Sequence, residues 1–539
     1  SDLQTTLKQF EEADNFGSLI QPAVKDVTAV LQTLKEKNVS HDLFLAPTHE
    51  KVLQVLEQAD YLSQKYHVVV ANPPYMGGSG MNDRLKVFLQ NNFEEAKTDI
   101  FSAFMIRNTT LSLEKGQLGF MTPFVWMFIS SYEKLRKFLI NTKTITSLIQ
   151  LEYSGFDGAT VPICAFTVEN EYKPNFIGGY IKLSNFKGSK NQAPKTLEAI
   201  SNRECGWFYN SSGSDFNKIP GKPISFWVSD DFRQIFTDNA KINTIALSDG
   251  QNITGDNERF IRFFWEVSYD DVSKNAKWPL MAKGGTFRKW YGNIIDVVNW
   301  SEEAREFYKK NKIARIQSEI LWFRKGITWN LITSSGTGFR LIGEDNLFNK
   351  AAPSLLFDNI KNEDIDKLLG YLNSNIVKKI LNILNPTLNT NIAEVLEIPI
   401  INFDDRVNQT TSILINISKS DWDSYEISSN FERPSILTSK FKTNIIEDSY
   451  ESLELFWKLQ TDEMKTLEEE NNQIFIKAFR LENELTPEVP LKEITLTCNP
   501  YYRYDAKKSK EELDALQLED TMKEYISYAV GVMLGRYSL

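Results

Sequence analysis

The sequence is poor in the residues that build metal centres and disulfide frameworks. Its 539 residues include three cysteines and three histidines. These residues are Cys164, Cys205, Cys498, His41, His49 and His67. None of them belongs to a Cys-x-x-Cys pair or to a close cluster of His and Cys. Zinc sites and disulfide-stapled folds need closely spaced ligands or paired cysteines, so both classes are disfavoured and we expect no metal.

The sequence also lacks a hydrophobic run of the roughly 18 residues that cross a membrane as a helix. Its best apolar run, residues 120–129, is much shorter. The first residues, SDLQTTLKQFEEADNF, do not show the basic-then-apolar pattern of a signal peptide. We therefore expect a cytoplasmic protein that does not enter a membrane.

Positive charge is in the minority, with 61 Lys and Arg against 71 Asp and Glu and a formal net charge of −10. This balance argues against a generally basic nucleic-acid coat. It does not exclude a local basic groove, because binding depends on where the charge lies. With about 150 residues per domain, a chain of this length predicts three or so domains.

The pattern of apolar residues predicts an α/β protein. Residues 1–66 have helical spacing, and residues 67–174 alternate strand, helix and strand, which is typical of a parallel sheet. Within 67–174 we expect strands at 68–70, 117–121, 145–151 and 163–168 and helices at 100–113 and 131–139. Residues 175–400 are rich in aromatics, Gly and Asn and predict a separate mixed domain. Helical patterns dominate residues 401–539.

One short stretch, HVVVANPPYMG from His67 to Gly77, combines a β-branched run with an abrupt stop. Two prolines cannot donate to a sheet ladder, so the strand must end there. The simplest interpretation is a buried parallel strand followed by a rigid turn. Asn72 and Tyr75 favour a second interpretation, a small site with a polar edge and a flat wall for a planar ring that carries an amino group.

Open α/β sheets bind ligands at the carboxyl ends of their parallel strands, where this turn is placed. The exocyclic amino group of adenine is a poor nucleophile because its lone pair is delocalised. The Asn72 side-chain oxygen and the Pro73 backbone oxygen could accept its two N–H bonds, and Tyr75 could stack on the base. Cytosine C5 chemistry needs a nucleophilic cysteine instead, and Cys164, on an expected strand, is more consistent with a core residue.

The Asn72-Pro73-Pro74-Tyr75 tetrapeptide resembles the catalytic motif of amino-methyltransferases that use S-adenosylmethionine. The stretches KTDIFSAFMIRNTTLSLEKGQLGFMTPFVWM and GFDGATVPICAFTV resemble the γ-type adenine DNA methyltransferases. By this resemblance, residues 67–174 are the catalytic part of a partial Rossmann-like methyltransferase domain, and Phe156 packs on a flipped adenine together with Tyr75. The alternative for Phe156 is a loop side chain that packs on the sheet edge.

Later stretches resemble the target-recognition region of large restriction-modification methyltransferases, namely IRFFWEV, MAKGGTFRKWYGN, FRKGITWNLITSSGTGFR and LLGYLNSNIVKKILNILNPT. SDWDSYE and NQIFIKAFRLENELTPEVPL resemble the C-terminal region of the PglX family of BREX phage-defence methyltransferases. The resemblance implies methyl transfer to N6 of adenine in double-stranded DNA, with a target-recognition domain at 175–400 and a helical C-terminal region at 401–539. Other phage-defence proteins are expected as partners.

The sequence departs from that family in one respect. The family carries a glycine-rich cofactor loop before the Asn-Pro-Pro-Tyr motif, whereas the only glycine before Gly77 here is Gly17. Asn72 and Pro74 would contact the methionine end of S-adenosylmethionine, but the rest of its site is missing, so we expect a fragment that is inactive alone. A displaced loop at Gly336-Thr337-Gly338 is an alternative, though short Gly-rich matches are weak.

Two further functions remain as alternatives. The chain could be a catalytically incomplete DNA-recognition or inhibitor-binding module, or, with less support, a protein-glutamine methyltransferase. If it binds DNA, a local basic cluster in residues 175–400 should do so, with Lys283, Arg288, Lys289, Arg324, Lys325 and Arg340 as candidates. The competing interpretation is that these are ordinary solvated charges.

Overall fold

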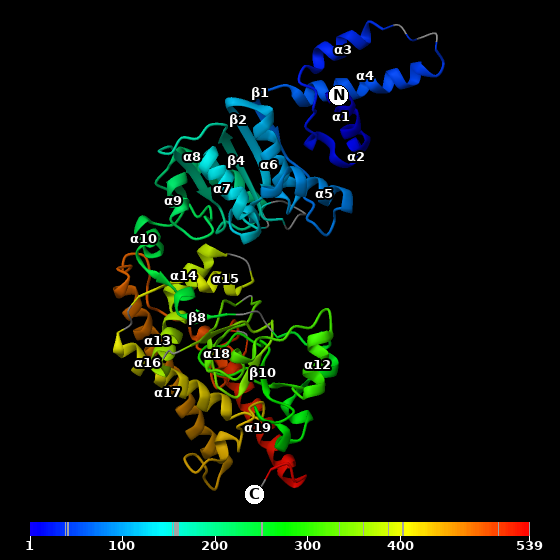
Figure 1. Ribbon diagram of the computed structural model, residues 1–539. Helices are drawn as coiled ribbons and strands as arrows, with labels where there is room; N and C mark the ends of the chain where they lie inside the picture. The colour runs from blue at the N-terminus through cyan, green and yellow to red at the C-terminus, as the bar shows by residue number, and fades with distance from the viewer. Residues whose placement is uncertain are drawn as a thin grey trace. The chain divides into compact units, whose positions relative to one another are not determined.

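The computed structural model describes residues 1–37, 39, 42–153, 155, 161–248, 252–333, 335–358, 361–385, 388–401, 404–504 and 506–537. The chain divides into two compact units, Ser1–Thr237 and Asp238–Leu539. The first unit is a mixed α/β unit built on one sheet, and the second combines small sheets with long helices (Figure 1).

Helices lead into the first unit, as the spacing of residues 1–66 predicts. They are α1 (Asp2–Gln9), α2 (Ala13–Phe16), α3 (Val27–Lys35) and α4 (Leu45–Ser63). Their apolar faces share a small core that includes Phe10, Ile20, Val27 and Leu56. Burial of these faces against one another stabilises helices that would be marginal in isolation.

In the described residues of the first unit, six strands form one sheet in the order β1-β2-β4-β3-β5-β6. Strands β1 and β2 are parallel, β4 is antiparallel to both β2 and β3, and β5 is parallel to β3. Strands β1, β2, β3 and β5 therefore point the same way, and their ends meet at what we call the carboxyl edge. The bounds are β1 (Tyr66–Ala71), β2 (Ser112–Pro123), β3 (Thr144–Gln150), β4 (Ile163–Glu169), β5 (Ile177–Lys182) and β6 (Phe208–Ser212).

Helices pack against this sheet through a large apolar core. Phe101 and Met105 of α6 and Leu135 and Leu139 of α7 join side chains of the strands in that core, and both helices lie over the sheet in Figure 1. The remaining bounds of this unit are α5 (Asp83–Asn92), α6 (Ile100–Leu111), α7 (Glu133–Thr142), α8 (Ser189–Ser201), α9 (Gly213–Asn217) and α10 (Asp230–Asp238).

The expected boundary between residues 174 and 175 falls inside this sheet. Strands β5 and β6, which follow that boundary, pair with β3 and with each other. The compact unit extends to Thr237. The expected boundary was too early because β5 and β6, with glycines and polar residues, lack the continuous apolar pattern of the earlier strands.

Strand β1 is parallel, as expected, but it is not buried. It lies at the end of the sheet order and pairs with β2 alone among the described strands. Val68 and Val70 are consequently 60% and 76% exposed. A β-branched run of this kind is typical of a strand with neighbours on both sides, so the open edge of β1 is an unusual feature.

The second unit contains two four-stranded sheets in its described part, ordered β14-β10-β11-β9 and β13-β12-β15-β8. A short pair, β16 and β7, lies apart from them. The strands are β7 (Ala240–Lys241), β8 (Ala246–Leu247), β9 (Ile261–Phe263), β10 (Leu280–Ala282), β11 (Asp296–Val298), β12 (Gly326–Thr328), β13 (Arg340–Ile342), β14 (Asn346–Phe348), β15 (Ser354–Phe357) and β16 (Pro399–Ile400).

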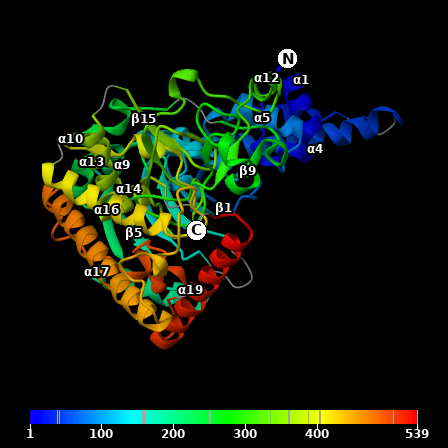
Figure 2. The same cartoon turned by 90° about the horizontal axis from the view of Figure 1, so that it is seen from below.

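Helices make up most of the C-terminal part of this unit, as the sequence predicts. Helices α16 and α17 lie side by side (Figure 2), and Asn471 of α17 donates to the Gly370 carbonyl of α13. The bounds are α11 (Asn257–Phe260), α12 (Glu302–Lys310), α13 (Asn362–Leu372), α14 (Asn375–Leu384), α15 (Ile392–Leu396), α16 (Asp405–Asp423), α17 (Ile446–Ala478), α18 (Pro500–Arg503) and α19 (Lys510–Met533). Among the described helices, none is long and apolar enough to span a membrane.

Candidate active site

The Asn72–Tyr75 turn begins where β1 ends, at the carboxyl edge of the sheet. Ala71, the last residue of β1, is in register with Phe120 of β2. The two prolines then stop the ladder because neither can donate a backbone hydrogen bond. Pro73 is buried, whereas Asn72, Pro74 and Tyr75 are exposed. The polar and aromatic side chains of the turn are therefore accessible from outside.

Tyr75 folds back over the turn. Its hydroxyl donates to the Asn72 Oδ1 at 3.1 Å and approaches the Met121 carbonyl of β2 at 3.3 Å. Its ring meets Phe101 of α6 edge to face, with centroids 6.2 Å apart. These contacts link the two side chains that the sequence singles out and place them on the face of the sheet that α6 covers.

Asp99 anchors the turn from the next helix. It caps α6, where its side chain accepts from the Phe101 backbone N–H, and it also accepts from the Met76 N–H at 2.9 Å. The Ile100 N–H donates in return to the Met76 carbonyl. Burial raises the pKa of the Asp99 carboxyl. Asp99 is thus a positioning residue, and an Asp directly before an apolar helical run was the signal for it.

The turn can hold an amino group by accepting its hydrogen bonds. A carboxamide oxygen has two lone pairs, so Asn72 Oδ1 can keep the Tyr75 hydroxyl and still accept one N–H. The Pro73 carbonyl is the expected second acceptor, fixed in place by the two rigid rings. Acceptors that are oriented before the reaction stabilise charge developing on the amine without reorganisation.

Cys164 does not take part in such chemistry, which confirms its expected place in the core. It lies in β4, is fully buried, and its Sγ is 3.7 Å from the Thr122 hydroxyl oxygen. Burial raises the pKa of the Cys164 thiol to about 12. A thiol in this state is a poor nucleophile, because the thiolate is the reactive form.

The rest of a cofactor site is not found among the described residues. No strand precedes β1 there, so no glycine-rich turn leads from a strand into a helix before the Asn72–Tyr75 turn. Gly336 has a φ of +98°, but the chain continues from it into strand β13 rather than a helix. Of the described residues, the two expected to contact S-adenosylmethionine, Asn72 and Pro74, are exposed at the turn. Phe156, expected to stack on the target base, lies outside the described residues.

Three of the six basic candidates for DNA contact are buried, which corrects the prediction for them. Arg288 and Lys289 have side chains only 4% and 8% exposed and form ion pairs with Asp421 and Glu468. Arg340 is fully buried and donates to the Asn330 Oδ1 at 2.8 Å. Their side chains are engaged in contacts inside the second unit.

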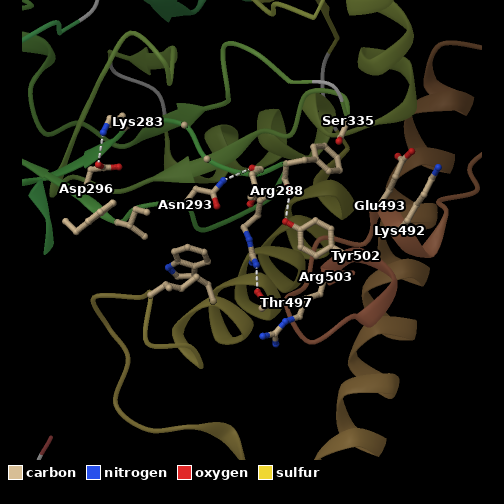
Figure 3. A pocket seen from close by; sticks show the side chains of 18 residues that line it. Lys283, Arg288, Asn293, Asp296, Ser335, Lys492, Glu493, Thr497, Tyr502 and Arg503 are labelled. Atoms are coloured by element: carbon tan, nitrogen blue, oxygen red, sulfur yellow. Dashed lines mark hydrogen bonds and ion pairs between the residues drawn. The ribbon is translucent and has the colours of Figure 1, made fainter. Parts of the chain in front are cut away.

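The other three candidates are more accessible but also paired. Lys283 lies 3.1 Å from Asp296, Arg324 lies 3.3 Å from Asp358, and Lys325 lies 3.0 Å from Asp366. Lys283 lines a cavity of about 970 Å³ within the second unit. Other residues around this cavity, shown in Figure 3, include Arg288, Asn293, Lys492, Tyr502 and Arg503. Basic and aromatic side chains therefore gather at one hollow of this unit.

Comparison with known proteins defines the class of the first unit. Residues 5–156 match the family described as Eco57I restriction-modification methylase. A type II restriction enzyme and methyltransferase of Escherichia coli, RM.Eco57I, is 28% identical over 181 residues, which are 32% of this chain and 18% of that protein. This part of the chain is therefore similar to methylases of the restriction-modification kind, a class of enzymes whose chemistry implies the use of S-adenosylmethionine.

The chain as a whole is a homologue of adenine-specific methyltransferases of the BrxX and PglX type, which confirms the resemblance seen in the sequence. BrxX of Escherichia coli O9:H4 (strain HS) is 31% identical across 100% of this chain. PglX of Lacticaseibacillus casei (strain Zhang) is 29% identical, also across 100% of the chain. The chain spans less than half the length of these relatives, 44% and 46% respectively.

Two solved structures show weaker likeness. The type IIL restriction-modification enzyme MmeI in complex with DNA has a TM-score of 0.43 and 10% identity, over 80% of this chain and 58% of that one. A nuclease-deletion mutant of the type ISP enzyme LlaGI in complex with a DNA substrate mimic also has a TM-score of 0.43, with 13% identity over 68% and 43% of the two chains. Likenesses of this strength say nothing about function.

Proposed function

We propose that this chain is the target-base and DNA-contacting part of an adenine-specific DNA methyltransferase of the BREX phage-defence type. Its reaction is methyl transfer to N6 of an adenine turned out of duplex DNA, since an enzyme must extrude a stacked base to reach it. Modification of host DNA would place the protein in the cytoplasm. Other phage-defence proteins are its proposed partners.

The observation that carries this proposal is the Asn72–Tyr75 turn at the carboxyl edge of a parallel strand. Asn72 would accept one N–H of the adenine amino group and the Pro73 carbonyl the other, which directs the nitrogen lone pair away from both acceptors. Tyr75 would cover the ring, and Asp99 would keep the turn in place through the Met76 N–H. When bound, S-adenosylmethionine supplies the methyl group.

We infer that the chain alone does not complete the cofactor site. The exposed valines of β1 leave room for a further strand, and a glycine-rich turn at a helix N-terminus is the usual cradle for such a ligand. Asn72 and Pro74 would meet only the methionine end of the cofactor. The adenosine contacts would then come from polypeptide beyond these 539 residues, and the isolated chain would not methylate DNA.

DNA recognition is proposed for the second unit. Lys283, Arg324 and Lys325 are the basic candidates that remain there, and the large cavity beside Lys283 offers aromatic and polar groups for contact with DNA. Each lysine or arginine that meets a phosphate adds to affinity and to its dependence on salt. Exchange of this unit between related enzymes should move the sequence preference with it.

The test is Asn72→Ala in an intact enzyme that joins these residues to a complete cofactor site. We expect the methylation rate to fall by at least about 10²–10³-fold, the usual effect of removing one preorganised hydrogen-bonding group. DNA affinity should stay nearly unchanged, because Asn72 orients the amine and does not hold the duplex. Asn72→Asp keeps an acceptor oxygen and should retain more activity. Mass spectrometry of N6-methyladenine gives the rate, and wild-type methylation by Asn72→Ala would sink the assignment.

A second candidate is a module that recognises DNA, or a protein inhibitor, without catalysis of its own. The open edge of β1 favours it for the isolated chain. The two candidates separate when the missing cofactor-binding part is supplied. If the chain is the catalytic part, the completed protein should form N6-methyladenine, and this activity should depend on Asn72. If the chain is only a recognition module, the completed protein should form none.

A further inference from the structure

A row of residues crosses the sheet of the first unit at its carboxyl edge. Thr122 of β2 is in register with Cys164 of β4, Cys164 with Gln150 of β3, and Gln150 with Lys182 of β5. Residues in register across a sheet point to the same face. Lys182, the last residue of β5, therefore shares a face and an edge with the Asn72–Tyr75 turn, whose tyrosine packs on α6 over that face.

The ammonium of Lys182 rests on an aromatic ring. Its Nζ lies 3.5 Å from the ring centroid of Trp227, close enough for a cation–π contact. Among the described residues, its side chain has no carboxylate partner, and burial lowers the pKa of the Lys182 ammonium to about 8. Lys173 of the same unit, by contrast, pairs with Glu169. An unneutralised, half-buried cation is costly and calls for an anion.

Aromatic side chains connect Trp227 with strand β2. The ring of Trp227 lies 5.7 Å from that of Phe128, and Phe128 lies 6.2 Å from Phe124, which follows the end of β2. Met121 of the same strand receives the Tyr75 hydroxyl. The carboxyl edge thus carries two partly exposed rings, Phe124 and Trp227, which are joined through the buried ring of Phe128. Rings beside a cation are the elements with which proteins follow a nucleic-acid strand.

Gln150 adds an independent sign of an unfilled site. It is 6% exposed, and its Oε1 is buried without a hydrogen-bond partner among the described residues. Buried polar atoms are nearly always satisfied, so one without a partner needs an explanation. Gln150 is the register neighbour of Lys182, and an ammonium has three donors. If an anionic ligand moved the Lys182 Nζ away from the Trp227 ring, one N–H of the ammonium could donate to the Gln150 Oε1.

We propose that Lys182, held over Trp227 at the carboxyl edge, contacts a backbone phosphate of the DNA bound at the Asn72–Tyr75 turn. A phosphate supplies the anion and the acceptor oxygens that Lys182 lacks. Neighbouring strands are about 4.8 Å apart, so four steps from β1 to β5 put Lys182 roughly 19 Å from the turn. That distance corresponds to about five to six nucleotides along one strand of B-DNA. The inference rests on the proposed function, since it assumes that DNA occupies this edge.

Lys143 provides a matched control on the same sheet. It precedes β3, so it lies at the opposite edge, and its Nζ stands 5.7 Å from the ring centroid of Phe138. Burial lowers the pKa of the Lys143 ammonium as well. Lys143→Met therefore removes the same kind of charge from the same kind of setting, but away from the proposed DNA path.

The experiment measures duplex affinity of the full 539-residue chain at several salt concentrations. Loss of one phosphate contact reduces the slope of log affinity against log salt by about 0.9. We expect this reduction in Lys182→Met, which keeps the stem over Trp227, and an unchanged slope in Lys182→Arg and Lys143→Met. An unchanged slope in Lys182→Met, an equal reduction in Lys143→Met, or no DNA binding by the chain would overturn the proposal.

A second measurement needs no variant and guards against misfolding. An amine-reactive reagent at about pH 8 should modify Lys182, because burial lowers the pKa of its ammonium to about 8 and part of the amine is then unprotonated. Duplex DNA should slow the modification of Lys182 and leave Lys143 unaffected, as read by peptide mass spectrometry. Equal modification of Lys182 with and without DNA would contradict the contact. The Lys182 contact and the proposed function can fail separately. If Lys182 does not contact DNA but Asn72→Ala abolishes methylation in the intact enzyme, the proposed function still stands.

Discussion

Tyr75 does not stand free beside Asn72 but donates its hydroxyl to the Asn72 Oδ1. The same oxygen is the proposed acceptor for the adenine amino group, so the two residues act on one acceptor site. The hydroxyl and the ring of Tyr75 have separable roles as a result. The hydroxyl orients the Asn72 carboxamide, and the ring, 40% exposed, offers a surface for the base.

Two variants of Tyr75 separate these roles in an intact enzyme. Tyr75→Ala removes the ring, and we expect it to weaken retention of the extruded base by about 1–3 kcal/mol, the usual contribution of one stacked ring. Tyr75→Phe keeps the ring, so the base should remain extruded while methylation slows through a less ordered Asn72. A fluorescent adenine analogue at the target position reports extrusion. An undiminished extrusion signal in Tyr75→Ala would remove the stacking role.

Among the elements of the second unit, the loop at residues 283–293, between β10 and β11, contacts the long helices α16 and α17 through its side chains. The Lys289 ammonium pairs with Glu468 of α17, and the Trp290 indole N–H donates to the same carboxylate at 2.7 Å. The Arg288 guanidinium forms an ion pair with Asp421 of α16 and donates a hydrogen bond to the Thr497 hydroxyl oxygen. Buried charges of this kind act as structural connectors, and breaking one leaves its partner unpaired.

Lys289→Met should therefore destabilise the protein and not simply weaken DNA binding. We expect a loss of about 3–5 kcal/mol in unfolding free energy, because Glu468 would remain buried without its cation. Lys310→Met, which removes an exposed partner of the exposed Glu306, should cost about 0–1 kcal/mol. Urea unfolding measures both. A Lys289→Met variant that is as stable as the wild type but has lost DNA affinity would show that Lys289 contacts DNA.

The contrast between these elements explains what the sequence could predict. The strand at 68–70, the stop at Pro73 and the turn are local signals, and the structure has β1 at Tyr66–Ala71 with the turn directly after it. The burial of Lys289 depends on Glu468, 179 residues further along the chain, and no local pattern announces it. Lys182 likewise gave no signal, because its setting depends on Trp227 and on the register of four strands.

At the scale of the whole molecule, the two compact units divide the proposed tasks. The first carries the turn that would hold the target amine, and the second carries the cavity and the accessible basic residues proposed for DNA. The sheet of the first unit ends at β1 with Val68 and Val70 exposed, and no described strand lies beyond β1 to hold the proposed cofactor. The chain also spans only 44% and 46% of its two full-length homologous relatives.

We propose that these 539 residues hold the target-base half of a methyltransferase site and not the cofactor half. Calorimetric titration of the chain with S-adenosylmethionine, and separately with duplex DNA, tests it most directly. We expect the chain to bind DNA with an affinity that falls as salt rises, and to bind S-adenosylmethionine weakly or not at all. Micromolar, one-to-one binding of S-adenosylmethionine would contradict the claim and turn attention to the glycines around Gly336 as a displaced cofactor loop.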